Sequence, residues 1–212
     1  MQILGNSGHA LIWGLGWPES CPVSREVSPR QFYPVIRKSP APPHAFEVVP
    51  MRWGLVPHWC LTREDLEKYS SKTFNARAET AHEKPTFRDS FWRRRCLIQI
   101  AGFLEWRTIE KCREKHLVLS SNAGPLILAG LWDRACIEGK VLESFTVLTC
   151  PPNALLDDIH QRMPVILGQK AARDWLEHQG SPADLLRPCP SHWLEIVPAN
   201  EGKNSGFDLG ED

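Results

Sequence analysis

The sequence predicts an α+β fold with a mixed, mostly antiparallel β core, barrel-like in form, and a few short peripheral helices. Three observations lead to this class. Short apolar runs recur along the chain between turn residues, which is typical of strands. The 18 Pro residues favour loops and extended segments over a helical bundle. The length of 212 residues suits one domain with a hydrophobic core of its own.

Strands are expected where apolar residues gather between turn residues. Residues 96–107, which read CLIQIAGFLEWR, give the clearest prediction. An apolar run of this length is more typical of one buried strand than of a loop. The polar residues 108–115 indicate a hairpin loop. Further strands are expected at residues 32–37, 46–51, 116–119, 126–132, 145–148 and 165–167.

Short helices are expected around this core. Residues 62–70 form a polar helical pattern, and residues 171–178 form an amphipathic one around Trp175. A third short helix is expected over residues 151–156, which begin with two prolines. Together these segments predict a β core with helices at its periphery.

Composition excludes several classes of protein. Lys+Arg and Asp+Glu number 25 each, so net charge indicates neither a nucleic acid nor a membrane as partner. No apolar run approaches about 20 residues, so we expect no membrane-spanning helix. The seven cysteines include no C-x-x-C pair. We therefore expect reduced, mostly buried thiols, no zinc site and no disulfide framework.

Two residues are candidates for proton transfer. Glu105 lies between Leu104 and Trp106 at the end of an apolar run, where a carboxyl group is either paired or protonated. The alternative is a Glu105 that points to solvent from an alternating strand. His160 lies beside an arginine and two acids, which suits a proton carrier. The alternative there is a core histidine paired with a carboxylate.

Other side chains suit binding to a base or a phosphate. Asn75 and Arg77 share a face if residues 74–80 are extended. The Arg77 guanidinium can bind a phosphate with two hydrogen bonds, whereas the alternative is a surface pair between Arg77 and Glu79. Trp59 is a candidate for an exposed stacking surface.

A cluster of cations follows in the same half of the chain. Residues 92–95 read Trp-Arg-Arg-Arg, which places an aromatic ring next to three cations. Such a run is either a track for phosphates or a solvated face of the protein.

Six stretches of the sequence fit one common pattern. They are WGLVPHW (53–59), FNARAET (74–80), CLIQIAGFLEW (96–106), AGLWD (129–133), SFTVLT (144–149) and IHQRMPVIL (159–167). In this order and spacing they resemble the SRAP family, the SOS-response-associated peptidases, also called abasic-site processing proteins. The resemblance covers residues 25–205 as one domain. Residues 1–24 are then a divergent or mis-started segment, and residues 206–212 are a frayed acidic tail.

The resemblance implies a protein that binds single-stranded DNA and bonds covalently to abasic sites. In the family, removal of Met exposes an N-terminal cysteine, whose amine and thiol attack the ring-opened sugar and close to a thiazolidine. The motif matches carry six functional residues of the family onto this chain. They are the catalytic Asn75, Glu105 and His160 and the DNA-binding Trp59, Arg77 and Arg162.

These residue types suit the implied chemistry. An abasic sugar is mostly a closed hemiacetal, so a proton must move before the ring opens. A Glu105 with a raised pKa can supply that proton, and His160 can exchange the proton of the sugar hydroxyl. Asn75 can hold the nucleophile in place.

The chain departs from the family at its start. The family begins Met-Cys-Gly-Arg, whereas this chain begins Met1-Gln2-Ile3, and its first cysteine is Cys21. Three explanations are open: a true start upstream, a lost covalent step with DNA binding retained, or a Schiff base formed by an N-terminal amine that drives strand cleavage. We expect thiazolidine formation to be lost in the polypeptide as written. Because the N-terminal cysteine is missing, the sequence does not decide whether this chain has the family's lyase or crosslinking activity with N-terminal autoproteolysis.

An alternative function comes from a different class. Trp59, Arg77 and Arg162 alone would make a non-catalytic single-stranded DNA-binding module that senses damage without bonding to it. A third alternative, a cysteine hydrolase that uses Cys96 or Cys150 with His160, ranks last because both thiols lie in apolar strands.

The expected surroundings follow from this interpretation. We expect single-stranded DNA with abasic sites as the partner, no membrane association, no metal or other cofactor, and a monomer. In a bacterium we expect the protein in the cytoplasm, associated with the nucleoid. In a eukaryote we expect it in the nucleus.

Overall fold

The structure is a computed structural model, and twelve strands and four α-helices lie in the part of the chain that it describes. That part comprises residues 2–5, 11–19, 21, 26–40, 45–109 and 112–199. The strands are β1 (Gln2–Leu4), β2 (Glu26–Val27), β3 (Phe32–Lys38), β4 (Phe46–Trp53), β5 (Asn75–Arg77), β6 (Arg95–Ile100), β7 (Gly102–Ile109), β8 (Cys112–Ser120), β9 (Leu126–Ile137), β10 (Lys140–Cys150), β11 (Met163–Pro164) and β12 (Leu194–Pro198). The α-helices are α1 (Arg63–Ser70), α2 (Pro85–Arg93), α3 (Gln169–Leu176) and α4 (Pro182–Leu185).

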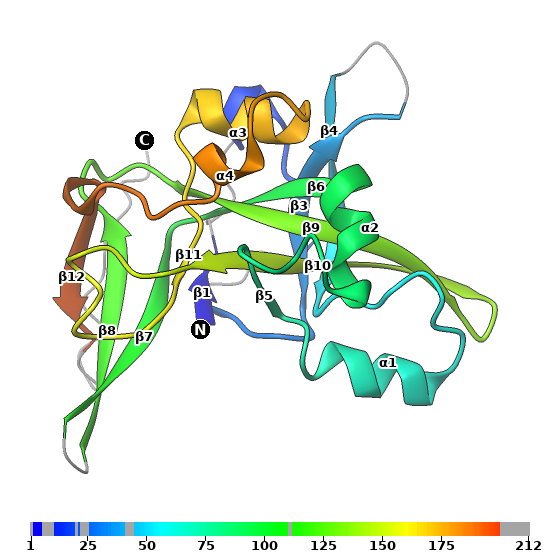
Figure 1. Cartoon of the computed structure of the whole chain (residues 1–212), viewed down its shortest axis with the longest axis horizontal. Coiled ribbons are helices and arrows are strands. Elements are labelled where there is room, and N and C mark those ends of the chain that lie inside the picture. The colour runs from blue at the N-terminus through cyan, green and yellow to red at the C-terminus, as the bar shows by residue number, and fades with distance from the viewer. Residues whose placement is uncertain are drawn as a thin grey trace.

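Five strands close into a small barrel. The sheet runs in the order β10-β4-β3-β6-β9, and the long β9–β10 hairpin pairs its two ends (Figure 1). All these pairings are antiparallel except β10 with β4. The expected α+β class with a mostly antiparallel, barrel-like core is therefore confirmed.

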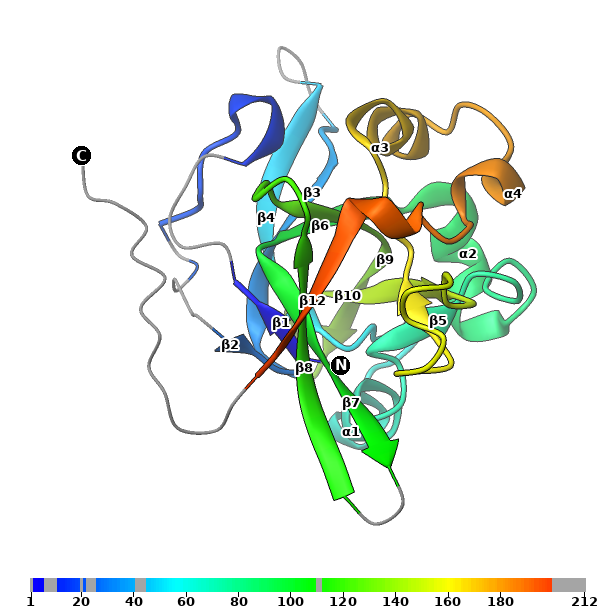
Figure 2. The same ribbon diagram turned by 90° about the vertical axis from the view of Figure 1, so that its left-hand side faces the viewer.

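A second sheet, in the order β12-β8-β7-β1-β2, is antiparallel throughout. Its β7–β8 hairpin extends away from the barrel (Figure 2). The sheet matters for function because β7 carries Glu105 and β1 carries Gln2.

The expectation of one strand over residues 96–107 is wrong, because the run breaks at Ala101 into β6 of the barrel and β7 of the second sheet. At Gly102 the chain passes very close to β8. A Cβ there would lie 2.7 Å from the carbonyl oxygen of Val118, so only glycine allows this approach. A continuous apolar run thus serves two sheets.

The hairpin loop expected over residues 108–115 is wrong as well, since β7 continues to Ile109 and β8 begins at Cys112. Polar side chains stabilise these exposed strands by cross-strand pairing. Arg107 faces Glu114, and the Trp106 ring lies 5.9 Å from the Nζ of Lys115. The low hydrophobicity of the segment reflects a hairpin with solvent on both sides.

Helices α1 and α3 confirm the patterns at residues 62–70 and 171–178. Thr62 caps α1 in a capping box with Asp65, which satisfies two backbone N–H groups at the helix start. Helix α2 has no counterpart among the expected elements. Its sequence lacks a long apolar stripe, so periodicity did not reveal it.

The helix expected over residues 151–156 is not present. The Asn153 side chain accepts from the backbone N–H of Leu156 at 3.1 Å and donates to the carbonyl of Cys189 at 3.1 Å. An asparagine that bonds its local backbone in this way favours a turn over a helix. The strand expected at residues 165–167 is reduced to β11 and one bridge between Leu128 and Ile166.

The core fills the barrel and the layer beneath the helices. Trp53 is fully buried, as expected, with its ring stacked on that of Phe145 at 6.1 Å and its N–H donated to the carbonyl of Phe74. Within the residues described, no helix is long and apolar enough to cross a membrane.

Candidate active site and nucleic-acid interface

The carboxyl group of Glu105 lies inside the protein on β7 and is 5% exposed. Strand β8 places His116 opposite Glu105, and β1 pairs Gln2 with the neighbouring Leu104. Burial raises the pKa of Glu105 above its usual range, and the charge of the nearby His160 ring limits that rise. Of the two alternatives for this acid, the structure selects the buried one.

His160 is the partner of Glu105. Its Nε2 lies 4.0 Å from Oε2 of Glu105, although 55 residues separate the two along the chain. The histidine sits in the turn that follows β10 and stays partly open to solvent, with 45% of its side chain exposed. A buried acid thus faces an accessible imidazole, which is the arrangement that general acid–base chemistry needs.

The other ring nitrogen of His160 contacts both backbone groups of one residue. Nδ1 lies 3.1 Å from the N–H nitrogen of Arg162 and 2.9 Å from its carbonyl oxygen. A neutral Nδ1 can accept from the N–H, and a protonated Nδ1 can donate to the carbonyl. The ring can therefore gain or lose a proton at either nitrogen without turning.

The side chain of Arg162 is held by an acid from another segment. Its two terminal nitrogens bind the carboxylate of Glu79 at 2.7 and 2.8 Å, and one of them also donates to the carbonyl of Thr149. This bidentate contact with Arg162 keeps the pKa of Glu79 below its usual range. The sequence offered Arg77 as the partner of Glu79, and the structure pairs Glu79 with Arg162.

Strand β5 carries Asn75 and Arg77 and lies next to Thr149, the residue that Arg162 contacts. It runs parallel to β10, and Arg77 pairs in register with Thr149. The Arg77 side chain is exposed, whereas Oδ1 of Asn75 is buried and has no hydrogen-bond partner among the described residues. Unpartnered buried acceptors of this kind are uncommon in folded proteins, so Asn75 is notable among the residues of β5.

Gln2 lies on β1, directly beside the strand that carries Glu105. It pairs with Leu104 on β7, one residue from Glu105, and its side-chain amide donates to the hydroxyl of Ser28 at 3.2 Å. An amide has no nucleophilic thiol to offer at this position.

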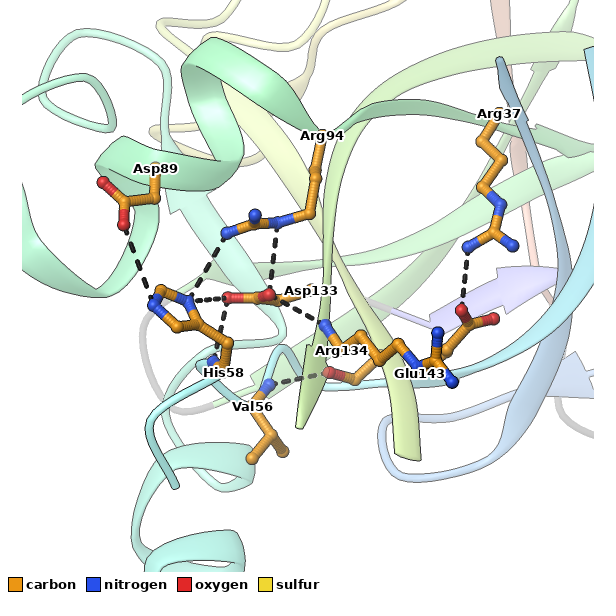
Figure 3. Close-up of polar contacts among 9 residues, drawn as sticks. Arg37, Val56, His58, Asp89, Arg94, Asp133, Arg134 and Glu143 are labelled. Atoms are coloured by element: carbon orange, nitrogen blue, oxygen red, sulfur yellow. Dashed lines mark hydrogen bonds and ion pairs between the residues drawn. The ribbon is translucent and has the colours of Figure 1, made fainter. Parts of the chain in front are cut away.

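Trp59 belongs to a second group of side chains. It is 42% exposed and packs edge-on against the ring of His58, which in turn contacts the buried Asp133. Figure 3 shows His58 and Arg94 around the carboxylate of Asp133. The six expected residues therefore fall into a Glu105–His160 pair, a β5–Arg162 neighbourhood beside it, and a separate Trp59 surface.

Sequence reasoning missed Glu79 and Asp133 as organising residues. Both are acids inside the matched motifs FNARAET and AGLWD. Asp133 follows an apolar strand segment, as Glu105 does, so the same sequence pattern could have identified Asp133. The partner of Glu79 was not, because 83 residues separate Glu79 from Arg162.

Internal thiols do not suit nucleophilic catalysis here. Cys96 and Cys150 are fully buried, and burial raises the pKa of both, that of Cys150 to about 12. A thiol with so high a pKa holds almost no thiolate at neutral pH. The geometry therefore disfavours a cysteine hydrolase.

Fold and site together define a barrel protein in which a buried acid faces an accessible histidine beside arginines, with an exposed indole on a separate surface. The sequence profile of the family described as SOS response associated peptidase (SRAP) matches residues 17–205. The abasic site processing protein YoqW of Bacillus subtilis (strain 168) is 37% identical over 171 residues, which are 76% of this chain and 75% of YoqW. The abasic site processing protein HMCES of Xenopus tropicalis is 33% identical over 73% of this chain and 54% of its own.

Solved structures show the same architecture. A crystal structure of a protein from Bordetella bronchiseptica superposes with a TM-score of 0.83 at 27% identity, covering 94% of this chain and 99% of that one. A second, from Bacteroides thetaiotaomicron, gives a TM-score of 0.78 at 28% identity and covers 92% of this chain. The chain belongs to the SRAP family.

Proposed function

We propose that this protein processes abasic sites in DNA, and that it takes the damaged strand in single-stranded form. The observation that carries the proposal is the contact between the buried Glu105 and the accessible His160. The names of the relatives YoqW and HMCES, both abasic site processing proteins, support it. Arg77, beside Thr149, suits a phosphate next to the damaged nucleotide.

The acid–base pair would open the abasic sugar. The carboxyl of Glu105 keeps its proton more readily than an exposed glutamate, so it can donate that proton to the ring oxygen. His160 removes the proton of the hydroxyl on C1, the bond from C1 to the ring oxygen breaks, and C1 becomes an aldehyde. Positioned acid–base catalysis of this kind supplies about 10²- to 10⁴-fold in rate.

A second candidate is favoured by Gln2. Residue 2 pairs with Leu104, the neighbour of Glu105, and its side chain is an amide without a thiol, so a thiazolidine cannot close from residue 2. The protein would then read the abasic site and hold it without a stable bond, or form only an imine with an amine. These outcomes leave different products on DNA, so one experiment separates them.

The test uses a labelled single strand with one abasic site, resolved on a denaturing gel. We expect Glu105→Gln to remove any cleaved or crosslinked product while native-gel binding stays within about twofold. Binding without product in the unaltered chain supports the non-catalytic reader. A stable, thiol-dependent band shift contradicts the role given to Gln2, and failure to bind any abasic strand contradicts both candidates.

A further inference from the structure

A buried carboxylate on β9 ties together two surface segments that carry exposed tryptophans. Asp133 is 2% exposed and accepts from the backbone N–H groups of His58 at 3.0 Å and Arg134 at 2.8 Å. It also contacts Nδ1 of His58 at 3.1 Å and forms an ion pair with Nε of Arg94 at 3.1 Å (Figure 3). A buried carboxylate is stable only with such partners. Asp133 therefore fixes the segment that carries Trp59 relative to the end of α2.

The ring of His58 extends this link to the outer face of α2. Its Nε2 lies 3.9 Å from Oδ2 of Asp89 (Figure 3). The ring also packs against that of Trp59, at 4.9 Å between centroids. Residues three and four apart are neighbours on a helix, so Asp89 lies beside Trp92 and Arg93. Trp59 and Trp92 thus belong to one surface, joined by His58 and Asp89.

Both indoles of this surface are unusually open to solvent. Trp59 is 42% exposed and Trp92 is 55% exposed. The buried Phe91 packs edge-on against Trp92 at 5.1 Å and supports it from behind. Large aromatic side chains that a fold holds at its surface are typical of binding sites.

The same helix face carries positive charge. Arg88 and Arg93 are exposed, and Asp89 is the one acid in α2. The chain as a whole has no net charge, so this local excess is not a by-product of a basic protein. Aromatic platforms beside arginines are the combination that holds single-stranded nucleic acid, by base stacking and phosphate contacts.

A short turn of the chain connects the proposed site to this surface. The turn after β5 hydrogen-bonds back onto Arg77, whose carbonyl accepts from the N–H of Ala81 at 2.9 Å. Helix α2 begins at Pro85, directly after this turn, and stands beside β5 in both views (Figures 1 and 2). A DNA strand whose phosphate is held at Arg77 can therefore pass along α2.

We propose that Trp59, Trp92, Arg88 and Arg93 form one extended binding surface for single-stranded DNA, assembled by Asp133. It takes nucleotides that flank the abasic site, with one base on each indole and phosphates on the arginines. This inference rests on the proposed function and adds Trp92, the α2 arginines and the organising role of Asp133.

The test measures binding of fluorescent oligothymidines with one abasic site, one about 4 and one about 12 nucleotides long. We expect Trp92→Ala to weaken binding of the long strand about tenfold and to leave the short strand unchanged, because only the long strand reaches α2. The control is Phe32→Ala, which removes another exposed aromatic ring, 47% open, from β3. The double variant Arg88→Gln with Arg93→Gln should weaken the salt dependence of binding. The negative slope of log affinity against log salt should become less steep by about 1.4.

Equal affinity of Trp92→Ala and Phe32→Ala for the long strand would overturn the inference. That result is expected if the surface of α2 binds another protein and does not contact DNA. The proposed function would survive, since the short abasic strand would still bind. Loss of binding to both lengths in the unaltered protein would instead remove the proposed function itself. Asp133→Asn should reproduce the loss seen with Trp92→Ala if it folds, and Trp92→Ala decides the matter if it does not.

Discussion

The carboxyl group of Glu105 is buried on β7, and its pKa is raised because the charged form is poorly solvated there. A raised pKa in the folded state means that folding favours the protonated form. Its contribution to stability is complete below the unfolded pKa, about 4.3, and is lost as pH rises through the folded value. Ionisation of Glu105 at neutral pH therefore opposes folding.

We expect Glu105→Gln to be more stable than the unaltered protein at pH 8 and equally stable near pH 4. The neutral amide keeps the shape of the side chain and removes the buried charge. Urea denaturation at the two pH values measures the difference in free energy of unfolding. A stability gap that does not change with pH would show that burial of charge is not the cause.

Glu79 acts on the chemistry through two other residues. It binds the side chain of Arg162. The backbone N–H of Arg162 in turn contacts Nδ1 of His160, and Nε2 of that ring faces Glu105. We expect Glu79→Gln to slow abasic-site processing by about tenfold to a hundredfold, because small misplacements of a proton carrier cost rate steeply. Single-turnover rates at saturating DNA measure this.

A neighbouring acid provides the control for that experiment. Glu83 has 70% of its side chain exposed and contacts His82 at 3.3 Å, so Glu83→Gln removes the same charge without touching Arg162. Equal rates for the two variants would argue that net charge, and not the position of His160, determines the effect.

The chemistry of single residues was readable from the sequence, whereas their pairing was not. An acid at the end of an apolar run and a histidine among charges identified Glu105 and His160, and the structure brings them together. The bond between Glu79 and Arg162 depends on where β5 and the turn after β10 meet, and no local pattern encodes that meeting.

At the scale of elements, Gly130 marks where β9 lies most tightly between its neighbours. A Cβ there would lie 2.5 Å from Cδ1 of Ile98 and 2.8 Å from the carbonyl oxygen of Thr146. We expect Gly130→Ala to destabilise the fold by about 1 to 3 kcal/mol through overpacking. Thermal or urea denaturation measures the loss.

Gly16 is the matched control, since a Cβ there would meet nothing within 4 Å. Gly16→Ala should leave stability within about 0.5 kcal/mol of the unaltered protein. Equal losses at the two glycines would contradict the packing argument.

Apolar runs located the strands of the barrel, but they did not assign each strand to a sheet. The run over residues 96–107 looks continuous because both halves are buried, and only the close approach at Gly102 divides it. The β7–β8 hairpin was expected, but its loop was predicted too long because the outer ends of its strands are polar. Helix α2 was missed because it has no long apolar stripe.

At the scale of the whole molecule, the fold sorts the seven cysteines into two classes. Cys112 and Cys136 are exposed, whereas the other five are buried. Burial raises the pKa of Cys60 and Cys189 to about 11, which further suppresses their thiolates. We expect a thiol reagent to modify two cysteines in the native protein and all seven in denaturant, as counted by mass spectrometry. Rapid modification of a third thiol without denaturant would contradict the packing of the barrel.

The barrel also includes a pairing between strands that are far apart in the chain. Strand β4 pairs with β10 across about 90 residues. Glu105 precedes β10 in the chain, whereas His160 follows it. Such long-range pairing makes refolding slow, on the order of milliseconds to seconds. A ribosome-bound chain that has not yet released β10 and the turn after it can already form the β3–β4 ladder, yet it holds only half of the acid–base pair. The Glu105–His160 pair, on which the proposed activity depends, therefore forms only after β10 and the turn after it have been made.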